Sequence, residues 1–169
     1  MKKGFTLMEI LIAILIVGVL VAMAAPMYEK AIEKSRIADV RVKLKRLYEA
    51  KMRVMDNMES ETYSPALFGL ENLDYAFDCE GTSVFQNDHR MSCNTSDFKY
   101  VINPTGSGNE NAVCAVRLQG DYQGVAFLFR EDTGAGQADR LLCNDSNSPD
   151  GKCEVYGMDS TGDAPWCTL

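Results

Sequence analysis

The stretch that decides the fold is FTLMEILIAILIVGVLVAMAA, residues 5–25. Apart from Thr6, Glu9 and a glycine, every residue in it is apolar. As a helix with a rise of about 1.5 Å per residue it would be roughly 31 Å long, which matches a bilayer core of about 30 Å. Lys2 and Lys3 precede it, so the positive-inside rule places the N-terminus in the cytoplasm. The sequence therefore predicts a single helix that spans a membrane.

Glu9 is out of place in such a segment. A carboxylate at mid-depth in a membrane costs about 2.5–3.5 kcal/mol on insertion scales, and less near the interface. Glu9 lies about one helical turn from Phe5, close to the cytoplasmic interface. An ionisable residue here indicates a function and needs a partner. We expect a positive charge at similar depth on a neighbouring chain, such as a free α-amino group.

The sequence GFTLME at residues 4–9, between a short basic leader and an unbroken apolar run, resembles the N-terminus of type IV pilins and of type II secretion pseudopilins. The resemblance implies that a prepilin peptidase cleaves between Gly4 and Phe5 and methylates the new Phe5 amine. It also implies that Glu9 pairs with the Phe5 amine of an adjacent subunit, with Thr6 in the same assembly contact. This would explain why the carboxylate is retained.

Gly18 and Pro26 extend the resemblance. They weaken a helix by about 1 and 3 kcal/mol relative to alanine, and a kink is expected at Pro26. The resemblance implies a helix break between them, because this stretch loses helical structure when such filaments assemble. The alternative is that both residues are simply common in membrane helices. The triplet at residues 26–28 is similar to the Pro-x-Tyr of pilins proper.

Residues 27–58 predict the second half of the same helix, since the segment contains no glycine or proline. Apolar residues recur at spacings of three, four and seven and form one stripe. Lysines and arginines mixed with acids fill the remaining positions, including the i,i+4 pairs Asp39–Lys43 and Glu49–Arg53. The interleaved acids favour a solvated face over a lipid or nucleic-acid surface. Joined to the first half, this makes one helix of about 53 residues, roughly 80 Å long. The stripe consists of Ile37, Val40, Leu44, Leu47, Val54 and Met58.

The remaining residues, 59–169, predict a β-rich head. Strand-like runs occupy residues 98–103, 113–119 and 124–130, with weaker candidates at 141–143 and 153–156. Residues 57–97 are expected to be mostly loop, with a short helix possible at 65–75. Antiparallel strands on one face of a helix make an α+β fold, and the resemblance implies the same pilin-like arrangement. The predicted organisation is a leader at 1–4, a membrane or filament-core helix at 5–26, an amphipathic spine at 27–58 and the head at 59–169.

Six cysteines all lie in the head, and no two have CxxC spacing, which argues against a zinc or thioredoxin-like motif. With the apolar N-terminus they predict disulfides formed in an oxidising compartment; the alternative is six buried thiols in a cytosolic protein. Fifteen connectivities are open. Short loops and element order favour Cys79–Cys93 and Cys143–Cys153, which leaves Cys114 with Cys167. The resemblance to pilins implies a C-terminal disulfide around a surface loop, either residues 144–152 or, if Cys143 pairs with Cys167, the whole stretch between them.

No catalytic, cofactor or metal site is predicted. His89 is the only histidine and no nucleophile motif accompanies it. Residues 144–151 and 159–163 are rich in oxygen ligands, but the first misses the EF-hand register and both are interpreted as exposed turns. A formal charge of −7 and a pI near 4.7 disfavour general attraction to nucleic acid, and no specific nucleic acid is predicted.

Together with these patterns, the resemblance implies a structural subunit of a type IV pilus rather than an enzyme. The expected partners are the membrane before assembly, prepilin peptidase, the inner-membrane assembly machinery and, in an extracellular filament, further copies of the chain. One alternative is a pseudopilin of a type II secretion system. Another is a periplasmic enzyme or redox protein with an ordinary single-pass anchor.

Overall fold

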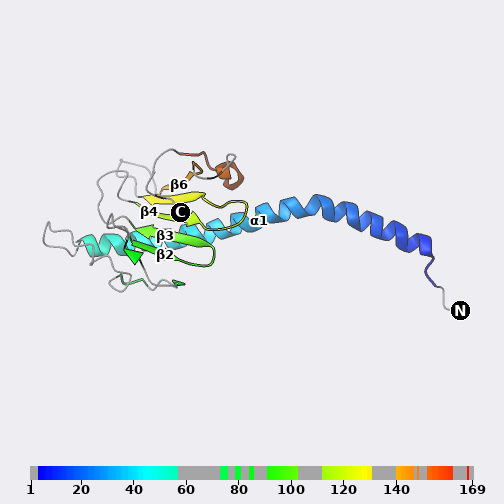
Figure 1. Cartoon of the computed structure of the whole chain (residues 1–169), viewed down its shortest axis with the longest axis horizontal. Helices are drawn as coiled ribbons and strands as arrows, with labels where there is room; N and C mark the ends of the chain where they lie inside the picture. The colour runs from blue at the N-terminus through cyan, green and yellow to red at the C-terminus, as the bar shows by residue number, and fades with distance from the viewer. Residues whose placement is uncertain are drawn as a thin grey trace. The chain divides into compact units, whose positions relative to one another are not determined.

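In the computed structural model the described residues form one long helix, six strands and a short 3-10 helix (Figure 1). Helix α1 spans Leu7–Asp56 and has 50 residues, which confirms the single long helix expected from the sequence. The chain divides into two compact units, residues 1–37 and 38–169, and each is described by itself. The structure describes residues 4–56, 73–75, 79–80, 84–85, 91–102, 112–130, 140–146, 148, 152–161 and 167.

The first unit consists of the N-terminal part of α1. The helix continues through Gly18 and Pro26 without interruption. The expected loss of helical structure between these residues concerns the assembled filament, and in the single chain this stretch is helical. Near the end of the unit Glu33 is buried and accepts an ion-paired hydrogen bond from Arg36, so it does not belong to the solvated face predicted from the sequence.

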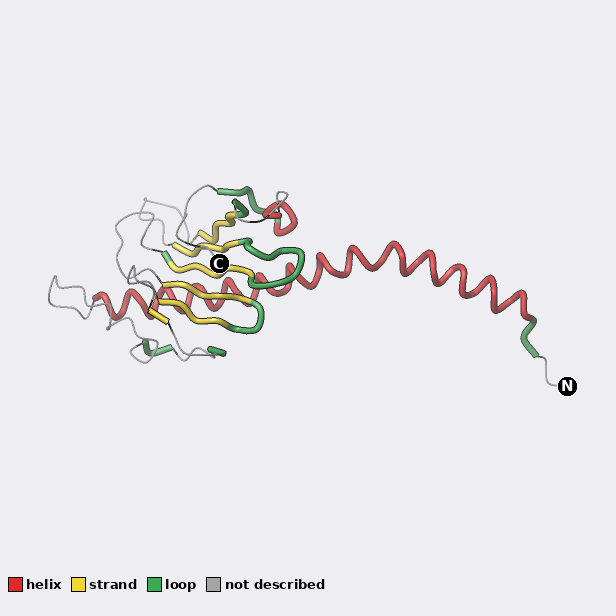
Figure 2. Tube along the Cα trace, viewed as in Figure 1, coloured by secondary structure: helices red, strands yellow, loops and turns green. Residues whose placement is uncertain are grey.

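The second unit contains an antiparallel sheet in which each strand pairs with the next, in the order β1-β2-β3-β4-β5-β6 (Figure 2). Every connection therefore joins neighbouring strands, as in a meander. The α+β fold class predicted from the sequence is confirmed. The strands are β1 (Val84–Phe85), β2 (Met91–Asn94), β3 (Phe98–Ile102), β4 (Val113–Arg117), β5 (Ala126–Arg130) and β6 (Arg140–Asn144), followed by the 3-10 helix η3 (Lys152–Tyr156).

One face of the sheet packs on residues 38–56 of α1. Val40, Leu44 and Leu47 of the predicted apolar stripe are at most 1% exposed. The ring of Tyr48, one residue further, meets the ring of Phe129 edge-on with their centroids 5.7 Å apart. Because side chains alternate along a strand, Phe129 identifies the face of β5 that contacts the helix.

The opposite face of the sheet forms a second core. Val116, Leu128 and Cys167 belong to a cluster of side chains that are no more than 2% exposed. Antiparallel sheets often leave one face in water, but β4 is buried at all five positions. Its residue Cys114 is joined to Cys167, which brings the C-terminal segment onto this face. Both faces of the central strands are therefore apolar.

The six cysteines form three disulfides, Cys79–Cys93, Cys114–Cys167 and Cys143–Cys153. Cys79–Cys93 and Cys143–Cys153 are the pairs that short loops and element order favoured, and Cys114–Cys167 is the pair that they left. They close sequence separations of 14, 53 and 10 residues, so the pair that holds the C-terminal segment also closes by far the longest loop.

Two predictions about the head are wrong. β1 and β2 lie in the region assigned mostly to loop. The two strand-favouring residues of β1 are too short a run to predict a strand. The MSCN sequence of β2 contains no β-branched residue, and its strand is established by pairing with β3 and by Cys79–Cys93. Residues 153–156 were a strand candidate but belong to η3, where the Cys153 amide donates to the Asp145 carboxylate. Most of the possible helix at 65–75 lies outside the described residues, and residues 73–75 form a bend.

One basic residue of α1 departs from the predicted solvated face, and a second, exposed one has a partner that was not predicted. Lys51 is fully buried, because it falls four residues after Leu47 on the apolar stripe itself. Arg53 donates two hydrogen bonds of 2.7 Å to Asp74, and the charge of its predicted partner Glu49 also contributes to its raised pKa. The predicted Asp39–Lys43 pair is confirmed at 2.8 Å.

The burial of Lys51 makes the stability of the head depend on pH. Burial lowers the pKa of its ammonium from 10.5 to about 8. Between these values the unfolded chain binds more protons than the folded one, so stability rises with pH. We expect the free energy of unfolding to increase by about 2 kcal/mol between pH 7.5 and 9.5, measured by denaturant titration of the detergent-solubilised chain.

The Lys51→Met variant is the matched control, because it fills the same position without a titrating group and should give a flatter profile. The window stops below pH 10 because burial raises the pKa of Tyr100, which makes stability fall at higher pH. Equal slopes for the two proteins would contradict this explanation.

The long disulfide is expected to stabilise the head more than the short C-terminal one. In the chain-entropy model, closing 53 residues rather than 10 adds about 1–2 kcal/mol. Replacing Cys114 and Cys167 by alanine should therefore lower the free energy of unfolding by more than replacing Cys143 and Cys153. The two double variants are compared by denaturant unfolding, and the reverse ranking would contradict the expectation.

Candidate functional site

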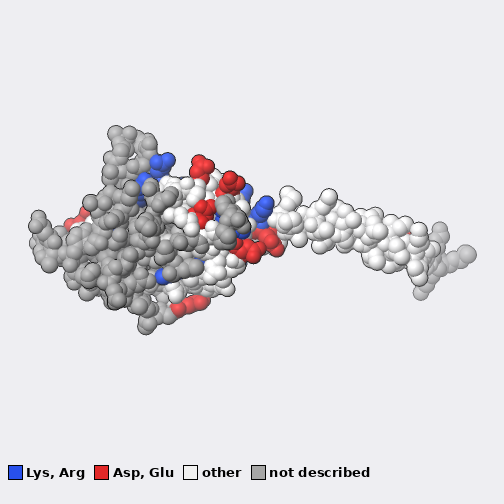
Figure 3. All heavy atoms as spheres, turned by 45° about the horizontal axis from the view of Figure 1, so that its top comes forward, with Lys and Arg blue, Asp and Glu red and all other residues white. Residues whose placement is uncertain are grey.

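The most unusual surface of the described chain is the N-terminal part of α1. Large apolar side chains from Phe5 to Tyr28 are between 47% and 83% exposed. The helix is long and apolar enough to cross a membrane, and the apolar window is not buried inside the chain. Figure 3 shows a long stretch of α1 without charged side chains on the face that it presents. This surface requires an apolar environment from outside the chain.

The helix begins with a capping box formed by Thr6 and Glu9. The Thr6 backbone N–H donates to Glu9 Oε2 at 2.9 Å, and the Glu9 backbone N–H donates to Thr6 Oγ1 at 3.3 Å. The Thr6 hydroxyl also donates to Glu9 Oε2 at 2.9 Å. Such reciprocal bonds satisfy two of the backbone donors that a helix N-terminus leaves open.

Glu9 therefore has a partner within its own chain, which the sequence analysis did not identify. The signal was present, since Thr-x-x-Glu before an apolar run is the sequence signature of a capping box. Both hydrogen bonds that the Glu9 carboxylate accepts from Thr6 end on Oε2, and among the described residues no hydrogen bond reaches Oε1. That oxygen remains available to a cation from another molecule.

Gly4 and Phe5 precede the helix in an exposed, non-helical conformation. Phe5 is 82% exposed. A Cβ atom added to Gly4 would meet nothing within 4 Å. The fold of the described chain therefore gives no reason for glycine at this position, and a requirement for it would have to come from another molecule.

Gly18 has the same property within the helix, since an added Cβ would meet nothing within 4 Å. Neither this glycine nor Pro26 interrupts α1. Both residues weaken the helix at their own positions relative to alanine.

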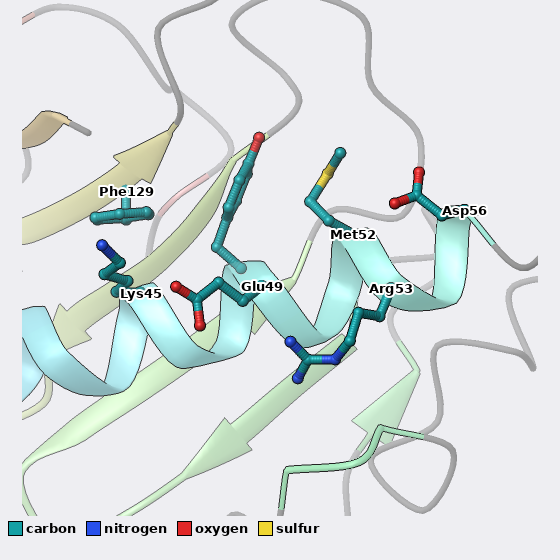
Figure 4. A pocket seen from close by; sticks show the side chains of 7 residues that line it. Lys45, Glu49, Met52, Arg53, Asp56 and Phe129 are labelled. Carbon is teal, nitrogen blue, oxygen red and sulfur yellow. The ribbon is translucent and has the colours of Figure 1, made fainter. Parts of the chain in front are cut away.

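The head contains a cavity of about 370 Å³ at the C-terminal end of α1. Figure 4 shows that its labelled side chains come from consecutive turns of α1, together with Phe129 of β5. The cavity has an aromatic wall and charges of both signs, but its Arg53 is already engaged by Asp74. It is lined by Lys45, Tyr48, Glu49, Met52, Arg53, Asp56 and Phe129.

The oxygen-rich loops are partly described. The Asp145 carboxylate accepts hydrogen bonds from the Ser160 hydroxyl and the Cys153 amide, and these bonds lower its pKa. It thus fastens the 3-10 helix and the following segment to the end of β6. Across the described ranges no group of three or more His, Cys, Asp or Glu side chains is placed to hold a metal ion. His89 lies outside the described residues.

Comparison with known proteins gives one match to a family model. Residues 1–25 match the prokaryotic N-terminal methylation motif. The match covers the leader, the capping box and the exposed apolar run, and it does not extend into the head. No solved structure matches the chain. The chain therefore carries the prepilin-type N-terminal segment that is the hallmark of type IV pilins and pseudopilins.

Proposed function

We propose that this protein is a structural subunit of a type IV pilus. The observation that carries the proposal is the exposed apolar run that directly follows a prepilin-type cleavage sequence. An ordinary anchor would explain the apolar run alone. It would not explain a methylation motif in which a glycine without a structural role precedes Phe5.

In this proposal the precursor is inserted in the inner membrane through residues 5–26. Prepilin peptidase removes residues 1–4 and methylates the Phe5 amine. The assembly machinery then extracts the subunit, so that the apolar helices bundle in the filament core. Residues 27–58 continue as the spine and residues 59–169 form the disulfide-bonded head. No catalytic residue or cofactor takes part.

Glu9 registers neighbouring subunits in this scheme. Its Oε2 is engaged by Thr6, whereas Oε1 faces no donor among the described residues. In an apolar filament core, an ammonium group such as the Phe5 amine of the next subunit would bind there through a charge-assisted hydrogen bond. Salt screens such a contact only weakly, because the surroundings exclude water.

A pseudopilin of a type II secretion system is the second candidate. It shares the methylation motif and the apolar helix, so both candidates predict the same processing. They differ in where the assembled subunits are found.

Mass spectrometry of surface-sheared and membrane fractions tests the proposal. A pilus subunit should be abundant in the sheared material, begin at methylated Phe5 and be six hydrogens lighter than the reduced chain because of its three disulfides. A processed chain confined to the membrane fraction would favour the pseudopilin. An intact Met1 in both fractions would overturn both candidates. Gly4→Leu is the control that should remain unprocessed, and since Gly4 has open space around it the fold should be unaffected.

The Glu9→Gln variant tests the registering charge. Glutamine keeps an oxygen that accepts from Thr6, so the helix start and the processing should be retained. It removes the negative charge, so we expect a large reduction or loss of filaments, measured as processed subunit in the sheared fraction and by electron microscopy. Normal filament yield from this variant would contradict the role assigned to the charge.

A further inference from the structure

We propose that Thr6 is a positioning residue for removal of the leader. By ending the helix at its own position, Thr6 keeps the Gly4–Phe5 peptide bond outside the helix and accessible to prepilin peptidase. This inference rests on the proposed processing between Gly4 and Phe5. It adds that Thr6, which does not flank the cleaved bond, affects how fast that bond is cleaved.

Thr6 has the geometry of an N-cap. Its carbonyl accepts from the Ile10 amide at 3.4 Å, so it belongs to the helical hydrogen-bond pattern. Its own N–H instead donates to the Glu9 side chain, and residues 4–6 are not helical. The helix therefore starts at Leu7, two residues after the bond to be cleaved.

Without this stop, the surroundings favour a longer helix. Unsatisfied backbone N–H groups are costly in an apolar environment, so an uncapped apolar helix would extend toward the lysines of the leader, where water is available. The Met8 amide would then donate to the Gly4 carbonyl in the regular i to i−4 pattern. In the structure no hydrogen bond to the Gly4 carbonyl is recorded from the described residues.

The state of this carbonyl bears directly on hydrolysis. Water must attack the Gly4 carbonyl carbon, forming a new C–O bond, and the C–N bond to Phe5 must break as the amine takes up a proton. A carbonyl enclosed in a helical turn is screened from attack and must first be unwound. A carbonyl held two residues before the N-cap, outside the helix, is open to attack without prior unwinding.

The test measures the initial rate at which the full-length precursor is cleaved in membranes that contain prepilin peptidase. Thr6→Val keeps the shape of the side chain but has no hydroxyl to cap the helix, and we expect it to be cleaved about fivefold more slowly, which corresponds to the usual strength of an N-cap. Thr6→Ser and Thr6→Asn both cap helices well and should be cleaved at rates close to that of the wild-type chain.

A second readout reports the helix start without the peptidase. In detergent micelles, amide hydrogen exchange at Met8 should be slower in uncleaved Thr6→Val than in the wild-type precursor, because the extended helix would engage this amide. Thr6 is exposed, so the variants should insert normally. The exchange measurement also detects any variant that is unfolded.

The outcomes separate the possible explanations. Equal or faster cleavage of Thr6→Val would overturn the inference while leaving the proposed function intact. Rescue by serine but not by asparagine would mean that the peptidase recognises the hydroxyl itself, and would also overturn it. A wild-type precursor that is not cleaved between Gly4 and Phe5 would instead refute the proposed function. Slow cleavage of Thr6→Val with rescue by both capping residues supports the positioning role.

Discussion

The need to cover the apolar surface between Phe5 and Tyr28 is the constraint on which the rest of this protein depends. Sixteen large apolar side chains in this stretch are largely exposed. At about 1.5–3 kcal/mol for each such side chain that is buried, the driving force to remove them from water is tens of kcal/mol. A monomer in water would leave these side chains exposed, and a small change in sequence would not remove enough of the apolar surface. A membrane or a bundle of identical helices would, and both have the same apolar character.

This common character explains why, within the apolar run at residues 5–25, polar side chains occur only at the start. Inside a uniform apolar environment a helix has no preferred depth or register. A carboxylate near one end supplies such a preference, because it must find hydrogen-bond donors. Thr6 provides donors within the chain, so that Glu9 is tolerable in a single subunit, and one oxygen remains for a partner. The same two residues define where the helix begins.

The head follows different physics from the N-terminal helix. Its sheet is buried on both faces, one by residues of α1 and the other by a cluster that includes Cys167. Such a second core depends on a covalent tie to the C-terminal segment, since Cys114 and Cys167 are far apart in sequence. Lys51 shows that the helix face was not optimised for burial alone, because a methionine or leucine would satisfy the stripe without a buried ammonium.

The sequence by itself determined the features that depend on local periodicity. The apolar run, the stripe through Val40, Leu44 and Leu47, and the alternating strands β3 to β5 were all predictable, because the spacing of apolar residues follows the repeat of a helix or a strand. The prepilin-type segment at residues 1–25 was likewise evident from contiguous residues. The capping box could have been found in the same way, since Thr6 and Glu9 are three residues apart.

Tertiary structure decided whatever required distant residues to meet. β2 carries little strand signal and β1 is only two residues long, so both exist through pairing. Residues 153–156 became a 3-10 helix through Asp145 and the disulfide to Cys143. The burial of Lys51 depended on which helix face the sheet would cover. Local sequence specifies the helix or strand propensity of each segment. Burial, disulfide partners and the covering of the second sheet face depend instead on contacts between segments that are far apart in the chain, and no local periodicity records those contacts.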